Sequence, residues 1–176
     1  MTSTAQQPTL TQRLVAEIQN EAQTTRRLIQ AIPVDQLQFR AHEKSHTLGG
    51  LASHIATVTS GIIDMAAVET CDASDISAEF DAPDSVGTVL ETFDASTKKA
   101  LDFVGGLDDE QLDATWTLTA GGKTIMTMSR YDVIRNILMN HIYHHRGQLG
   151  VYLRLAGAKV PSTYGPSGDE PPVFMQ

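Results

Sequence analysis

Apolar residues recur with the period of an α-helix in four segments of the chain. The first segment spans 9–31 and is ended by Pro33, a residue that cannot continue a helix. The second spans 45–69, where the positions three or four residues apart are Leu48, Leu51, His54, Ile55, Val58, Ile62 and Met65. A connector of acidic and small residues, Asp81 among them, follows the second helix.

The third and fourth segments carry clear signals at their ends. The third spans 85–104 and begins with a serine, a typical N-cap. The fourth spans 129–156, with Ser129 and Asp132 in the S-x-x-D capping pattern at its start and Gly157 just after its end. Between these helices, alternating residues on both sides of two glycines predict a short β-hairpin or a structured loop. Four long helices with one long crossover predict an all-α fold, a four-helix bundle, as a single domain over 1–176.

Composition narrows the classes of function. The net charge of −8 disfavours binding to phosphate backbones, and the densest basic spots are two pairs, so we expect no nucleic-acid partner. No stretch approaches the roughly 20 apolar residues that cross a bilayer, and the polar start lacks the regions of a signal peptide. We therefore expect no membrane partner and a cytoplasmic protein. The single cysteine, Cys71, excludes an internal disulfide and is predicted to lie in a loop.

Three histidines lie on the apolar stripes of two predicted helices. The last helix has the stripe Ile134, Leu138, His141, His145, Gln148, Tyr152 and Leu155, in steps of three or four. The pair His141 and His145 is therefore predicted to replace core residues and point into the bundle. His54 has the same place on the second helix, between Leu51 and Val58.

This arrangement favours one divalent metal ion bound by His54, His141 and His145. Buried imidazoles need partners for both ring nitrogens, and a metal ion satisfies the deprotonated nitrogens. Taken alone, His54 is better explained as a hydrogen-bonded core histidine, and the H-x-x-x-H pair is as easily a chance spacing. Three neutral ligands leave a coordination position open, which is typical of catalytic sites. A metal ion that merely clips two helices together is the plainer alternative.

The residues around these histidines have weaker assignments. His144 points about 60° away from His141, so it is predicted to lie on the flank or to help hold a ligand imidazole. Gln148 is the other candidate for that role, through a hydrogen bond to the second nitrogen of a ligand. His42 and His46 are expected to be exposed.

Four other positions near the pair have structural interpretations. Gly147 inside a helix costs about 1 kcal/mol relative to alanine, which suggests the close approach of another backbone. Arg146 is expected to form a surface salt bridge, or to face the tail or a partner chain. Tyr152 is predicted to pack in the core and Tyr164 to form a rim of the site.

The last helix and the residues after it carry a specific set of motifs. Asn-His-Ile-Tyr-His-His-Arg-Gly-Gln-Leu at 140–149 is followed by Tyr152-Leu153-Arg154, Gly157, Val160-Pro161 and Tyr164-Gly165. Upstream, Thr47-Leu48-Gly49 precedes Leu51-Ala52-Ser53-His54-Ile55-Ala56. Over nearly the whole chain these motifs resemble the DinB-like (YfiT-related) family of metalloenzymes.

The resemblance implies an up-down-down-up four-helix bundle, often a homodimer, with zinc or nickel on three histidines. By position these ligands are His54, His141 and His145, the set that the stripes also select. Better-understood relatives in the family are transferases and isomerases that depend on small thiols such as bacillithiol, mycothiol or glutathione.

Together these observations favour a metal-dependent transferase that uses a low-molecular-weight thiol and an electrophilic substrate. A metal-hydroxide hydrolase is the alternative enzyme, but no acidic residue shares the histidine stripe, and Asp64 and Glu17 are only the nearest candidates for its base. The alternative from another class is a non-catalytic metal- or ligand-binding bundle of the stress response.

Overall fold

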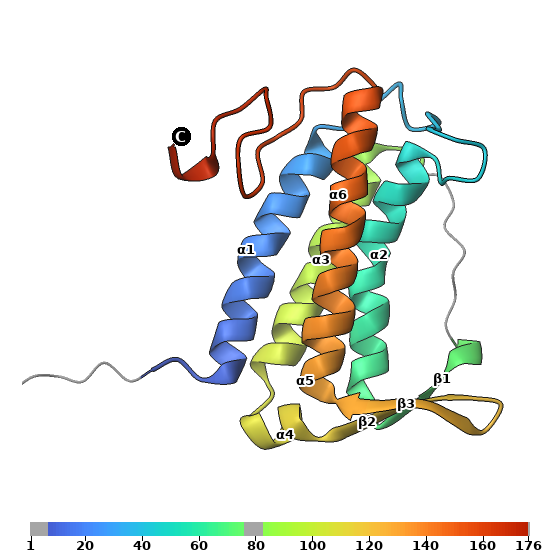
Figure 1. Ribbon diagram of the computed structural model, residues 1–176, viewed down its shortest axis with the longest axis vertical. Helices are drawn as coiled ribbons and strands as arrows, with labels where there is room; N and C mark the ends of the chain where they lie inside the picture. The colour runs from blue at the N-terminus through green and yellow to red at the C-terminus, as the bar shows by residue number, and fades with distance from the viewer. Residues whose placement is uncertain (1–6, 76–82, 176) are drawn as a thin grey trace, which may run out of the picture.

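The described chain is mostly helical, but it is not all-α. The computed structural model describes residues 7–75 and 83–175, so Asp81 and the first six residues lie outside the described part. A small three-stranded sheet accompanies the helices (Figure 1). In chain order the elements are α1 (Leu10–Gln30), α2 (Leu48–Ala67), β1 (Thr70–Asp72), a 3₁₀ turn (Ala73–Asp75), α3 (Val86–Gly105), α4 (Asp109–Asp113), β2 (Thr115–Ala120), β3 (Lys123–Ser129), α5 (Arg130–Asp132), a π-helical segment (Val133–Met139), α6 (Asn140–Leu155) and a 3₁₀ turn (Val173–Met175).

The predicted helix starts are confirmed by side-chain caps. Thr9 accepts a hydrogen bond from the backbone of Gln12 at the start of α1, and Ser85 caps α3 in the same way. Ser129 accepts the backbone N–H of Asp132 at the start of the last helical run. Gly157 follows that run with φ of +77°, the left-handed conformation that glycine adopts at little cost.

The last helical run differs from its prediction, because a π-helical segment precedes α6. A π turn holds more residues than an α turn, so it rotates the side chains that follow. The buried residues of this run are Val133, Ile134, Leu138, Met139, Ile142, Arg146, Leu149 and Leu153. The predicted stripe is therefore correct up to Leu138; beyond it His141, His145 and Tyr152 are only half-buried, and Gln148 and Leu155 are exposed, Leu155 to 58%.

The hairpin prediction is confirmed, and the sheet extends it. Strands β2 and β3 pair antiparallel around Gly121 and Gly122, both of which have positive φ. Strand β1 pairs parallel to β2, with Cys71 opposite Leu118. Cys71 is thus a buried strand residue, and its predicted place in a loop was wrong: the three-residue strand is too short to leave a pattern in the sequence.

The helices pack around two clusters of buried apolar side chains, one toward each end of the molecule. Helix α3 packs against α1 and α2, and α6 against α2 and α1 (Figure 1). Trp116 anchors the sheet to the helices: its ring is fully buried and its Nε1–H donates to the carbonyl of Met65 at 2.8 Å. Within the described ranges, no helix is both long enough and apolar enough to span a bilayer.

Candidate metal centre

Three imidazoles from two helices meet between α2 and α6. His54 Nε2 lies 2.8 Å from His141 Nε2 and 3.0 Å from His145 Nε2. The ring centroids of His141 and His145 are 4.5 Å apart. We refer to His54, His141 and His145 as the three-histidine cluster. The structure therefore brings together the three residues that the sequence selected.

The local fold explains why these rings converge. His54 is in the middle of α2 and is only 7% exposed, so its ring cannot turn to solvent. His141 and His145 are half-buried on α6, beside the buried stripe of Ile142 and Leu149. The pair points at α2 from the flank of the core rather than replacing core residues, because the π-helical segment sets its rotation.

Burial and mutual repulsion keep these imidazoles neutral. Desolvation, and then the nearby His145, His141 and His46, lower the pKa of His54 to about 4. The pKa of His141 is lowered by desolvation and by His145 and His144. Desolvation also lowers the pKa of His145, although its hydrogen bond with Gln148 acts in the opposite direction. A neutral imidazole is the form that binds a metal ion.

The donor set fits a divalent transition metal. The three ring nitrogens lie within 4.8 Å of one another, and within the described ranges no cysteine, aspartate or glutamate belongs to the group. Zn–N bonds of 2.0–2.1 Å in tetrahedral geometry correspond to N···N separations of about 3.3 Å, somewhat longer than the distances of 2.8 and 3.0 Å from His54 to the other two rings. Three nitrogen lone pairs so near one another repel unless a proton or a cation lies between them.

Two polar side chains extend from the cluster along α6. The Nδ1 of His145 lies 2.8 Å from Gln148 Oε1. The Nε2 of the same amide lies 3.2 Å from the Nε2 of His144. Both Gln148 and His144 are exposed, so the inward position expected for Gln148 was wrong, although its contact with a histidine of the cluster is present.

His46 lies nearer to the cluster than the sequence suggested. It is exposed, as expected, yet it lowers the pKa of both His54 and His145. Tyr152 on α6 donates its hydroxyl to the carbonyl of His46 at 3.1 Å, and its ring packs edge-on against Phe39. Tyr152 thus holds the segment before α2 against α6. No spacing in the sequence marks His46, because it precedes the helix rather than lying on one of its faces.

The two candidate bases have other partners, and the prediction for Gly147 was wrong. Asp64 pairs with Lys99 at 2.6 Å, and Glu17 accepts the hydroxyl of Tyr143 at 2.7 Å, so the two candidate bases are engaged elsewhere. Gly147 faces open space: a Cβ built there meets no atom within 4 Å outside its own helix. The expected approach of another backbone is therefore absent from the described structure.

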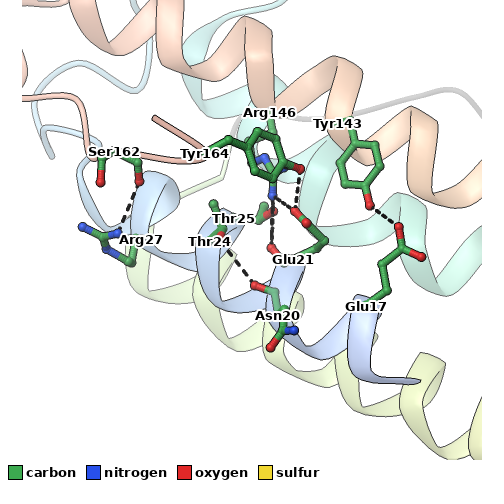
Figure 2. Close-up of polar contacts among 10 residues, drawn as sticks. All are labelled: Glu17, Asn20, Glu21, Thr24, Thr25, Arg27, Tyr143, Arg146, Ser162 and Tyr164. Atoms are coloured by element: carbon green, nitrogen blue, oxygen red, sulfur yellow. Dashed lines mark hydrogen bonds and ion pairs between the residues drawn. The ribbon is translucent and has the colours of Figure 1, made fainter. Parts of the chain in front are cut away.

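Arg146 forms a buried ion pair rather than the expected surface salt bridge, and it faces the tail, which was the alternative expectation. Its guanidinium donates to Glu21 Oε2 at 2.6 Å and to Thr25 Oγ1 at 3.3 Å (Figure 2). Tyr164 from the tail donates its hydroxyl to the same Glu21 oxygen at 2.8 Å and also contacts Arg146 Nη2. Tyr164 therefore joins the tail to α1 and α6, and its contacts are with this pair rather than with the three-histidine cluster.

The chain is similar in sequence to a known family and to a bacterial relative. A family model described as the DinB family matches residues 1–172. An uncharacterised protein, YrdA of Bacillus subtilis strain 168, is 27% identical over 150 residues, which cover 85% of each chain.

Two solved structures have a similar fold. A DinB-like protein from Bacillus cereus ATCC 10987 superposes with a TM-score of 0.69 at 21% identity, over 86% of this chain and 95% of that one. The DinB-like protein YjoA from Bacillus subtilis gives a TM-score of 0.67 at 20% identity, over 85% of this chain and 96% of that one. At these identities the similarity establishes the fold alone.

Proposed function

Because the chain belongs to the DinB family, we propose that it binds one divalent metal ion on His54, His141 and His145 and acts as a metal-dependent, thiol-using transferase. The observation that carries the proposal is the convergence of three Nε2 atoms from α2 and α6. We also take the long helices to form an up-down-down-up four-helix bundle with an added sheet, zinc and nickel being the preferred metals.

The donor set supports a site that is open to a further ligand. Three neutral imidazoles bring no negative charge, and within the described part of the chain no carboxylate joins them. A divalent ion bound there would supply uncompensated positive charge that favours an anionic ligand, such as the thiolate of a small thiol. His141 and His145 are only half-buried, which leaves a side of the cluster accessible to such a ligand.

The residues nearby favour thiol transfer over hydrolysis. A hydrolase that activates water would benefit from a carboxylate base beside the cluster, but Asp64 and Glu17 are paired with Lys99 and Tyr143. A thiol needs no separate base when a cation already lowers its pKa. The protein would then position the thiol and admit the electrophile from the exposed side.

Metal titration is the first test. We expect purified, metal-free protein to bind about one Zn²⁺ or Ni²⁺ per chain in isothermal titration calorimetry, and each of His54→Ala, His141→Ala and His145→Ala to lose that binding. His42→Ala is the matched control, because His42 is an exposed histidine outside the cluster. Equal binding by the wild type and the three variants would refute the metal centre.

Activity is the second test. The metal-loaded protein is incubated with a panel of biological thiols and a generic electrophile, and loss of free thiol is measured. We expect a rate enhancement with at least one thiol that disappears in His141→Ala and persists in His42→Ala. Metal binding without turnover for any thiol would favour a binding protein over an enzyme.

A further inference from the structure

The three-histidine cluster has a polar extension on its exposed side. From His145 the contacts pass through the side chain of Gln148 to His144, all within two turns of α6. The ring of His144 also lies edge-on to that of His145, with centroids 4.8 Å apart. His144 and Gln148 are four residues apart and therefore neighbours on the helix surface.

The chemistry of the amide fixes the direction of each hydrogen bond. An amide oxygen only accepts and an amide nitrogen only donates. With Oε1 of Gln148 at His145, the proton of His145 must be on Nδ1, which donates to that oxygen. With Nε2 of Gln148 at His144, the Nε2 of His144 must accept. This direction leaves the Nε2 of His145 unprotonated, and that atom is the one that faces His54.

We propose that Gln148 is a positioning residue that holds His145 in the Nδ1–H tautomer, and that His144 orients the Gln148 amide for this task. The proposal rests on the proposed metal centre, because the freed Nε2 is the atom offered to the ion. Without His144 the amide can rotate by 180° and present its nitrogen to His145, and that orientation favours the tautomer that cannot bind metal through Nε2.

The predicted effect on metal affinity is large for an exposed side chain. Residues that orient a metal-bound histidine typically change metal affinity about 10- to 100-fold when they are removed. We expect Gln148→Leu, which keeps the size but loses both hydrogen bonds, to weaken Zn²⁺ binding by about that factor. Gln148→Glu keeps an acceptor for His145 and should restore binding to within about threefold of the wild type. His144→Ala should show a smaller loss than Gln148→Leu.

The matched control is Gln23→Leu, an exposed glutamine in the middle of α1, a helix that contributes no histidine to the cluster. Its Zn²⁺ affinity and its thermal unfolding should equal those of the wild type. Thermal unfolding of Gln148→Leu should also be unchanged in the metal-free state, because Gln148 is exposed. A loss of metal affinity in Gln148→Leu then reflects a change in the imidazole of His145 and not a loss of folding.

The decisive measurement is the tautomer of His145, read by long-range ¹H–¹⁵N NMR of the metal-free protein. We expect the Nδ1–H form in the wild type and in Gln148→Glu, and its loss or mixing in Gln148→Leu and His144→Ala. An unchanged tautomer in Gln148→Leu, or unchanged Zn²⁺ affinity, would overturn the proposal. If the wild type binds no metal, the proposed function fails, whereas the tautomer measurement still decides the role of Gln148.

Discussion

Arg146 and Glu21 form a buried ion pair that joins α6 to α1 one residue beyond His145. Their charged atoms are 2.6 Å apart, with side chains only 4% and 16% exposed. The rings of Tyr143 and Tyr164 lie 5.2 and 5.0 Å from the guanidinium carbon, and Tyr164 shares the carboxylate (Figure 2). The pair therefore fixes α6, and the histidines on it, relative to α1.

Removing this arginine should destabilise the fold. Arg146→Met leaves the Glu21 carboxylate largely buried without its cation, and breaking a buried pair in this way costs about 3–5 kcal/mol. The free energy of unfolding in urea is the measurement. Arg26→Met is the control, since Arg26 and Asp94 form an exposed pair between α1 and α3, which we expect to contribute less than about 1 kcal/mol. Equal losses of unfolding free energy in the two variants would show that burial does not strengthen the pair.

Gly147→Ala should stabilise the protein. A helical glycine costs about 1 kcal/mol relative to alanine, and the added methyl group meets no atom within 4 Å outside the helix. The contrasting variant is Gly49→Ala, whose Cβ would lie 2.9 Å from both the carbonyl of Leu37 and Cδ of Pro83. Gly49→Ala should therefore lower the melting temperature. If Gly147→Ala were the destabilising variant, another chain would have to cover that face in solution.

The stability of the metal-free protein should fall in mild acid. Burial and neighbouring histidines lower the folded-state pKa of His54 to about 4, below its ordinary value of 6.5. The unfolded chain then binds more protons than the folded chain between these values, so the free energy of unfolding is highest above pH 6.5 and decreases toward pH 4. The same direction holds for His141 and His145.

Urea unfolding from pH 8 to pH 4 measures this dependence, with His54→Ala as the comparison. The variant should show a flatter profile, because it lacks the histidine whose folded-state pKa is lowered to about 4. Zn²⁺ should stabilise the wild type most at the upper end of the range, since protons compete with the ion for the same nitrogens. A wild-type profile that rises toward low pH would contradict the assignment.

Trp116→Phe should loosen the sheet from the helices. The substitution leaves the buried carbonyl of Met65 without the indole donor, which costs about 1–3 kcal/mol, with a further loss from the cavity. Ile125→Ala on β3 is the control, because Ile125 is 53% exposed and a surface change of this kind is usually worth less than about 0.5 kcal/mol. The free energy of unfolding in urea separates the two variants, with the transition monitored by circular dichroism rather than by tryptophan fluorescence.

Local signals in the sequence predicted much of the fold. The caps at Thr9, Ser85 and Ser129 and the glycine at 157 are chemical requirements of helix ends, so they marked the boundaries well. The double glycine in the hairpin did the same for a tight turn. Strand β1 was missed because its partner β2 is more than 40 residues away, and three residues carry no period of their own.

The candidate site was predicted less completely. Four-residue spacing correctly paired His141 with His145, and the stripe of α2 selected His54. The sequence could not reveal that the histidines of α6 flank the core, because nothing in residues 133–139 distinguishes a π turn from an α turn. The burial of Arg146 was missed because its partner, Glu21, is 125 residues away in sequence.

The π-helical segment shows that the spacing of His141 and His145 and the direction of their rings are set separately. An α-helix advances about 100° per residue, so the same residues wound as an uninterrupted α-helix would turn α6 around its axis by about the step of one residue. His141 and His145 would keep their spacing and their helix, yet their rings would sweep away from His54. The one extra residue in the π turn, which lies shortly before His141, thus sets the direction in which both imidazoles point toward α2.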